Sequence, residues 1–85
     1  MASSANDAPL SKEPVDRAIA LLRAGHKCEK KWLIWSYSKD QDRYFRSEWI
    51  CRDNEWTGRY LTEEELRQEI AQHPAAFRQM LTDAL

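Results

Sequence analysis

The segment KKWLIWSYSKDQDRYFRSEWICRDNEWTGRYL, residues 30–61, decides the fold that we expect for this chain. It contains eight of the nine aromatic residues of the protein, with basic residues spaced among them. Aromatic and β-branched residues favour strands, whereas the polar groups Lys39–Asp42 and Asp53-Asn54 are typical of turns. The segment therefore predicts a meander of three antiparallel strands, over residues 30–38, 43–52 and 55–60.

The two turns predict which strand residues lie opposite each other. A two-residue loop in the second turn places Glu48 opposite Arg59. A loop of the same length in the first turn places Trp35 opposite Arg46, although a loop of four or five residues is also compatible with this hairpin. One sheet face then holds the residues that we expect in the core: Trp32, Ile34, Phe45, Trp49 and Trp56. The other face holds a mixed aromatic and charged set: Leu33, Trp35, Tyr37, Tyr44, Arg46, Ile50, Arg52 and Arg59.

Helices are predicted on both sides of this segment. Apolar residues recur at helical spacing over residues 14–24, and Gly25 follows as a C-terminal stop. Thr62 and Glu65 have the spacing of a capping box, which predicts a second helix that ends near residue 72. Pro74 suits the first turn of a last helix, whose apolar stripe includes Phe77, Met80, Leu81 and Ala84. The fold class is α+β, with an N-terminal helix, a three-stranded antiparallel β-meander and two C-terminal helices. We expect residues 1–12 to be a disordered leader and residues 13–85 to be a single small α+β domain.

Composition excludes several classes of protein. The net charge of −1 exerts no general attraction on nucleic acid or on an anionic membrane. No apolar run approaches the roughly 18–20 residues that span a bilayer, and the N-terminus lacks the features of a signal peptide. With Cys28 and Cys51 as its only cysteines, the chain is expected to be a cytoplasmic protein with reduced thiols.

Candidate residues for chemistry are few. His26, Cys28, Cys51 and His73 could be considered as zinc ligands, but their spacing does not match that of known zinc sites. The chain has two histidines without an identifiable nucleophile, and two glycines that form no phosphate loop. The sequence therefore predicts a protein that is not an enzyme and that uses no metal and no cofactor.

Binding residues are expected on the mixed face of the sheet. Exposed Trp, Tyr and Arg dominate binding hot spots, so Trp35, Tyr37, Tyr44 and Arg46 are the predicted centre of a partner-binding site. Arg52 and Arg59 are expected at its rim. The sequence leaves open whether a helix covers this face and makes it a second small core. The acidic second helix offers an alternative interface: Glu63, Glu64, Glu65 and Glu69.

These observations favour a non-enzymatic protein-binding module, an inhibitor or adaptor of a larger assembly. The alternative is that the same face binds single-stranded nucleic acid or a nucleotide, by stacking bases on aromatic rings. The stripe of the last helix is either core or a surface for a homodimer. The order helix, glycine, basic residues and strand loosely resembles that of many small phage or mobile-element proteins, but no motif carries this likeness and no function follows from it.

Overall fold

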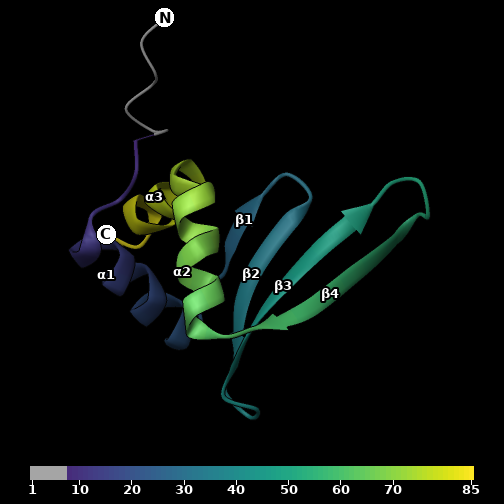
Figure 1. Cartoon of the computed structure of the whole chain (residues 1–85), viewed down its shortest axis with the longest axis horizontal. Coiled ribbons are helices and arrows are strands. Elements are labelled where there is room, and N and C mark those ends of the chain that lie inside the picture. The colour runs from purple at the N-terminus through teal and green to yellow at the C-terminus, as the bar shows by residue number, and fades with distance from the viewer. Residues whose placement is uncertain (1–7) are drawn as a thin grey trace, which may run out of the picture.

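The computed structural model describes residues 8–85, which form three helices and one four-stranded antiparallel sheet (Figure 1). The strands are consecutive neighbours in the order β1-β2-β3-β4. The α+β class is therefore confirmed, but the sheet has one strand more than the sequence predicts. In chain order the elements are α1 (Lys12–Arg23), β1 (Cys28–Lys30), β2 (Leu33–Ser38), β3 (Arg43–Ile50), β4 (Glu55–Leu61), α2 (Glu63–Gln72) and α3 (Pro74–Asp83).

The additional strand is β1, which pairs with β2 through a tight turn. Lys31 occupies this turn with a φ of 50°, in the left-handed region. That conformation is usual for Gly or Asn and uncommon for Lys, so the turn carried no sequence signal and residues 30–38 were expected to form one strand. Of the expected leader, residues 1–7 lie outside the described residues, and Leu10 packs against the core.

The helix ends follow the sequence signals closely. Gly25, with a φ of 106°, ends α1, and the N–H groups of Gly25 and His26 donate to the carbonyls of Leu22 and Leu21. This is the hydrogen-bond pattern of a Schellman motif. The capping box of α2 is also confirmed: Glu65 N donates to Thr62 Oγ1 at 3.1 Å, and Thr62 N donates to Glu65 Oε1 at 2.9 Å.

One of the two predicted strand registers is confirmed. In the β2–β3 hairpin, Trp35 lies opposite Arg46, as expected. In the β3–β4 hairpin, Glu48 lies opposite Thr57 instead of Arg59, so that prediction was wrong by two residues. The turn uses residues 51–54 rather than a two-residue loop. Because a shift of two residues returns every side chain to the same side, the grouping of residues into faces is unaffected.

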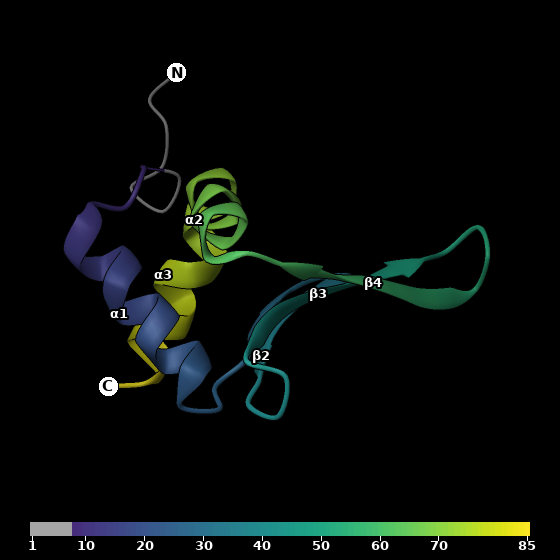
Figure 2. The same cartoon turned by 60° about the horizontal axis from the view of Figure 1, so that its bottom comes forward.

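The three helices lie together on one side of the sheet, and the β3–β4 hairpin extends beyond them (Figure 2). Side chains from this side of the sheet and from all three helices form one apolar core. The sheet contributes Cys28, Trp35, Tyr44 and Leu61, and the helices contribute Ala18, Ile19, Leu22, Leu66, Ile70, Ala76, Phe77, Met80 and Leu81. Among the helices of residues 8–85, none has both the length and the apolar character needed to cross a membrane.

The helices cover the sheet face that the sequence placed outside. Trp35, the expected centre of an exposed site, is fully buried and packs against Phe77 at a ring distance of 5.0 Å. Trp32 and Trp56, which were expected in the core, are 57% and 50% exposed. The grouping of residues into two faces is thus correct, but the expectation of which face is buried was wrong.

A polar contact with α2 explains why the charged face is the inner one. Glu69 is 8% exposed, and its Oε1 accepts a hydrogen bond of 3.0 Å from Trp35 Nε1. Arg46 Nε lies 2.9 Å from the same oxygen and forms an ion pair with it, but its N–H is not oriented for a hydrogen bond. Arg46 Nη1 donates to Glu48 at 3.3 Å. A buried charge is tolerated only when it is paired, and here each charge neutralises the other.

His73 extends this cluster at the end of α2. Its ring lies 5.1 Å from the ring of Trp35, and Nδ1 lies 3.3 Å from Lys30 Nζ. Burial lowers the pKa of His73 below its usual value of 6.5, and the neighbouring Lys30 lowers it further. Arg46 acts in the same direction, and the pKa is raised in part by Glu69. The imidazole is therefore favoured in its neutral form.

We expect Trp35→Ala to destabilise the protein by about 3–5 kcal/mol, because it leaves a large cavity and removes a hydrogen bond from a buried carboxylate. Trp32→Ala, on the open side, should cost less than about 1 kcal/mol. Chemical denaturation followed by circular dichroism would measure both. Similar losses for the two variants would contradict the assignment of the buried face.

We expect stability to fall as the pH drops below about 6.5, because the unfolded chain then binds a proton that folded His73 resists. Above that pH the histidine is neutral in both states and this contribution is complete. Urea unfolding at about pH 7.5 and about pH 5.5 would measure the change, and carboxylates titrate mainly below this window. His73→Gln should remove most of the slope, and an unchanged slope would assign it to other groups.

Candidate functional site

Tyr37 and Tyr44, two of the expected binding residues, hold α1 against the sheet. Arg23 Nη1 donates to Tyr44 Oη at 3.1 Å, and the guanidinium lies 4.9 Å from the centre of the Tyr37 ring. The Tyr37 hydroxyl donates to Asp42 in the turn between β2 and β3, and this bond raises the pKa of Tyr37. Both rings are therefore used within the fold, and they do not form an exposed site with Trp35.

The two expected rim arginines lie far apart in the sheet. Arg59 Nη1 is 3.4 Å from Glu65, and Nη2 is 4.0 Å from Glu69, so this side chain connects β4 to α2. Arg52 lies in the turn after β3, where its side chain is 88% exposed. The structure thus brings Arg59 together with the buried cluster and leaves Arg52 at the tip of the hairpin.

The acidic surface of α2, the alternative interface, is largely occupied by intramolecular contacts. Glu69 is buried against the sheet, and Glu65 forms the capping box, which lowers its pKa through the N–H of Thr62. Glu63 lies 3.2 Å from Arg67, which also contacts Asp16 of α1 at 2.9 Å. Glu69 is therefore not available at this surface, whereas Glu63 and Glu64 are exposed, and the acidic interface stays an alternative prediction.

The cysteines and histidines do not gather into one site. Cys28 is buried beside the core, and burial raises its pKa to about 12, whereas Cys51 is exposed in the β3–β4 turn. Cys28 lies opposite Trp35, and Trp35 lies opposite Arg46, five residues before Cys51. That separation of about 16 Å along the sheet is too long for a disulfide. Within residues 8–85, no three His, Cys, Asp or Glu side chains are grouped as metal ligands would be.

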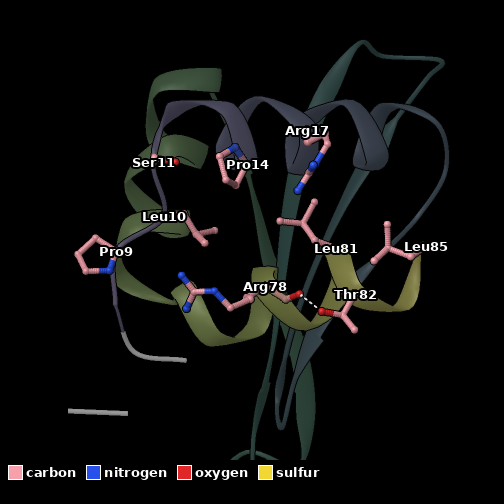
Figure 3. A pocket seen from close by; sticks show the side chains of 9 residues that line it. All are labelled: Pro9, Leu10, Ser11, Pro14, Arg17, Arg78, Leu81, Thr82 and Leu85. Carbon is pink, nitrogen blue, oxygen red and sulfur yellow. Dashed lines mark hydrogen bonds between the residues drawn. The ribbon is translucent and has the colours of Figure 1, made fainter. Parts of the chain in front are cut away.

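A hollow of about 330 Å³ lies between the N-terminal segment, α1 and α3 (Figure 3). Pro9, Leu10, Pro14 and Leu81 contribute apolar walls. Three polar side chains of the hollow have partners: Arg78 Nη2 donates to the carbonyl of Ala8, Thr82 Oγ1 donates to the carbonyl of Arg78, and Arg17 pairs with Glu13. The hollow therefore offers no converging set of free polar groups of the kind that orients a small ligand.

The most distinctive surface is the sheet face opposite the helices. We call it the aromatic face. Its strand residues are Ile34, Phe45, Trp49, Trp56 and Tyr60, and Trp32 adjoins them in the β1–β2 turn, where its carbonyl accepts a hydrogen bond from the N–H of Trp49. Trp32, Trp56 and Tyr60 are 57%, 50% and 42% exposed, and the other members are half-buried by one another. Within residues 8–85 the helices all pack on the other side (Figure 2). Contiguous apolar surface of this kind usually marks an interaction site.

The rings of the aromatic face are ordered by cross-strand pairs. The rings of Trp49 and Trp56 meet edge to face with centres 5.6 Å apart, and those of Phe45 and Tyr60 meet in the same way at 5.1 Å. Gly58 lies beside these pairs, and the Phe45 ring occupies the space above it. A Cβ at position 58 would come within 2.4 Å of that ring, so only glycine allows this packing.

Few charges lie on the aromatic face. Among the strand residues that point to this side, Glu29 and Arg43 are the charged ones, and both are at its margin. The guanidinium of Arg43 lies 5.2 Å from the centre of the Tyr60 ring, in cation–π geometry. The centre of the aromatic face is therefore formed by apolar, aromatic and uncharged polar residues. Sequence reasoning collected most of these residues correctly but assigned them to the core, because both sides of β2 are apolar.

Comparisons with protein-family models, with curated protein sequences and with solved structures give no match for this chain.

We expect Gly58→Ala to displace the Phe45 ring and to break its edge contact with Tyr60, because the added Cβ and the ring cannot share one space. Since the ring can rotate toward solvent, the loss of stability should be modest, at about 1–2 kcal/mol. Proton NMR would follow the ring-current shifts of Phe45 and Tyr60. Unchanged shifts in Gly58→Ala would contradict the packing described here.

Proposed function

We propose that this protein is a non-enzymatic protein-binding module whose interface is the aromatic face. The observation that carries this proposal is the exposure of two indole rings and one phenol ring on a sheet face that no helix of residues 8–85 covers. Trp and Tyr supply much of the binding free energy at protein interfaces, because they bury a large apolar area with little loss of conformational entropy.

The distribution of charge favours a protein partner over nucleic acid. Interface centres in protein complexes are depleted of charged residues and enriched in aromatic ones, as the aromatic face is. A surface that binds single-stranded nucleic acid requires cations along the phosphate path. On this face Arg43 is the nearby cation, and its guanidinium is already placed over Tyr60. We therefore keep nucleic-acid binding as the alternative function.

The small rigid scaffold fits the role of an inhibitor or adaptor. The cluster of Trp35, Arg46 and Glu69 holds the centre of the sheet from behind, and the rings of the β3–β4 hairpin are ordered by their cross-strand pairs. The aromatic rings are therefore presented on a preorganised surface. Preorganisation lowers the entropic cost of association, and a partner therefore gains affinity without any change in this protein. Such a module would act by occupying a surface of the larger assembly.

Affinity capture from a lysate of the source cells tests this proposal. The bait would be the wild type, the triple variant Trp32→Ala/Trp56→Ala/Tyr60→Ala, and the control Glu64→Ala on the exposed side of α2, each with and without nuclease. We expect a protein partner that is retained by the wild type and the control, lost with the triple variant and indifferent to nuclease. Circular dichroism would establish that the triple variant is folded.

Two outcomes would contradict the proposal. A partner retained by the triple variant but lost with Glu64→Ala would move the interface to α2. Saturable binding of a fluorescent oligothymidine, with an affinity that falls log-linearly with salt, would favour the nucleic-acid alternative. Association through an aromatic centre should respond only weakly to salt.

A further inference from the structure

Within residues 8–85, β4 forms a long edge of the sheet with which no other strand pairs. The sheet order places β1 at one edge and β4 at the other, and these strands have three and seven residues. The pairing of β4 with β3 is continuous from Glu55 to Leu61, and the strand contains no Pro and no Lys. Proteins commonly protect edge strands with such residues, with bulges or with short length. β1 is protected by its shortness. β4 is long, without Pro, Lys or a bulge, and its charged residues, Glu55 and Arg59, lie on the helix side of the strand.

A single hydrogen bond identifies which backbone groups of β4 point away from the sheet. Trp49 N donates to the carbonyl of Trp32 at 2.9 Å, so the backbone groups of Trp49 point toward β2. Because these groups alternate along a strand, those of Glu48 point toward β4 and meet Thr57. The N–H and C=O groups that point outward from the edge therefore belong to Trp56, Gly58 and Tyr60.

We propose that this edge binds the same edge of a second copy of the chain, with the two β4 strands antiparallel about a two-fold axis at Gly58. In that register Gly58 faces Gly58 of the second copy, and Trp56 faces its Tyr60. Every outward N–H and C=O group of the three residues then finds a partner, because all of them lie in hydrogen-bonded positions. Gly58 contributes no side chain at the axis, and the space above it is filled by the Phe45 ring of the same copy.

The side chains of the two edges complement each other in this register. On the aromatic face, Trp56 of one copy lies opposite Tyr60 of the other, a favourable cross-strand aromatic pair. On the helix side, Thr57 lies opposite Arg59, and Glu55 lies diagonal to Arg59 of the second copy. No like charges lie directly opposite each other. This self-complementarity is the reason that we commit to a second copy rather than to an unrelated peptide strand.

The dimer would contain one sheet of eight strands, four from each copy. Since residues that pair across the axis share a face, the two aromatic faces would lie on the same side and join at Trp56 and Tyr60. All helices would lie on the other side. Edge pairing would thus double the surface proposed for partner binding, although the pairing itself does not depend on what that surface binds.

Hydrogen exchange measured by NMR at two concentrations of the full chain tests the proposed register. At low concentration the amides of Trp56, Gly58 and Tyr60 should exchange rapidly, whereas those of Thr57 and Arg59 are protected by β3. At a concentration where sedimentation equilibrium detects a dimer, the first three amides should become protected. A chain that stays monomeric into the millimolar range would overturn the proposal. A dimer without this alternating protection would also overturn it and would indicate contact through another surface.

Substituting the exposed residue Thr57 with Arg or with Glu, which carry opposite charges, tests the proposed register. Thr57→Arg places like charges opposite each other at two symmetric positions and should weaken dimerisation by about tenfold. Thr57→Glu places opposite charges there and should strengthen it or leave it unchanged. Within one copy the neighbour of Thr57 is Glu48, so effects on the stability of the monomer should have the reverse order. Equal dimerisation of both variants would overturn the register.

Trp32→Ala separates this proposal from the one for the aromatic face. Trp32 lies in the turn between β1 and β2, near the edge of the sheet that is opposite to the β4 edge. We expect Trp32→Ala to dimerise as the wild type does, even if it weakens binding of a partner protein. Loss of the dimer in Trp32→Ala would indicate that two copies meet face to face through their aromatic rings, which would overturn edge pairing.

Discussion

The Glu69 carboxylate is the contact on which the arrangement of layers depends. It accepts a hydrogen bond from Trp35 and forms an ion pair with Arg46, and both of these residues belong to the sheet. Without the Glu69 carboxylate, the partly buried Arg46 would keep only Glu48 as an ionic partner, and its charge would be poorly compensated. The position of α2 therefore allows the charged side of the sheet to become the inner side. The helix side of the sheet combines apolar core residues with these charges, and the opposite side, which is also apolar, is left open.

The exposed aromatic face and the free β4 edge have one structural origin. Three helices packed on one side can cover only part of a four-stranded sheet, and the β3–β4 hairpin extends beyond them (Figure 1). The hairpin is therefore supported mainly by its own cross-strand contacts, including the pair of Trp49 and Trp56. A domain of this size gains little from exposing such rings, which favours a role for them in association.

Local features of the fold were readable from the sequence because each depends on neighbouring residues. The stop of α1 at Gly25 requires a left-handed conformation, and the capping box of α2 requires Thr62 and Glu65 at fixed spacing. The register of the β2–β3 hairpin was correct for the same reason. The turn at Lys31 was missed, because lysine is not a usual residue for a left-handed turn position. The turn after Ile50 was recognised from Asp53-Asn54, but its length was wrong, since it spans residues 51–54 instead of two residues.

The sequence by itself determined the α+β class, the helix ends and the division of strand residues into two faces, since these follow from periodicity and local hydrogen bonding. Only the tertiary structure decided which face is buried. Both sides of β2 are apolar, so hydrophobicity could not distinguish them, and the deciding contact joins Arg46 to Glu69 across 23 positions of the chain. The same holds for the candidate site. The sequence grouped its residues on one face, but whether that face is exposed depended on where α2 packs.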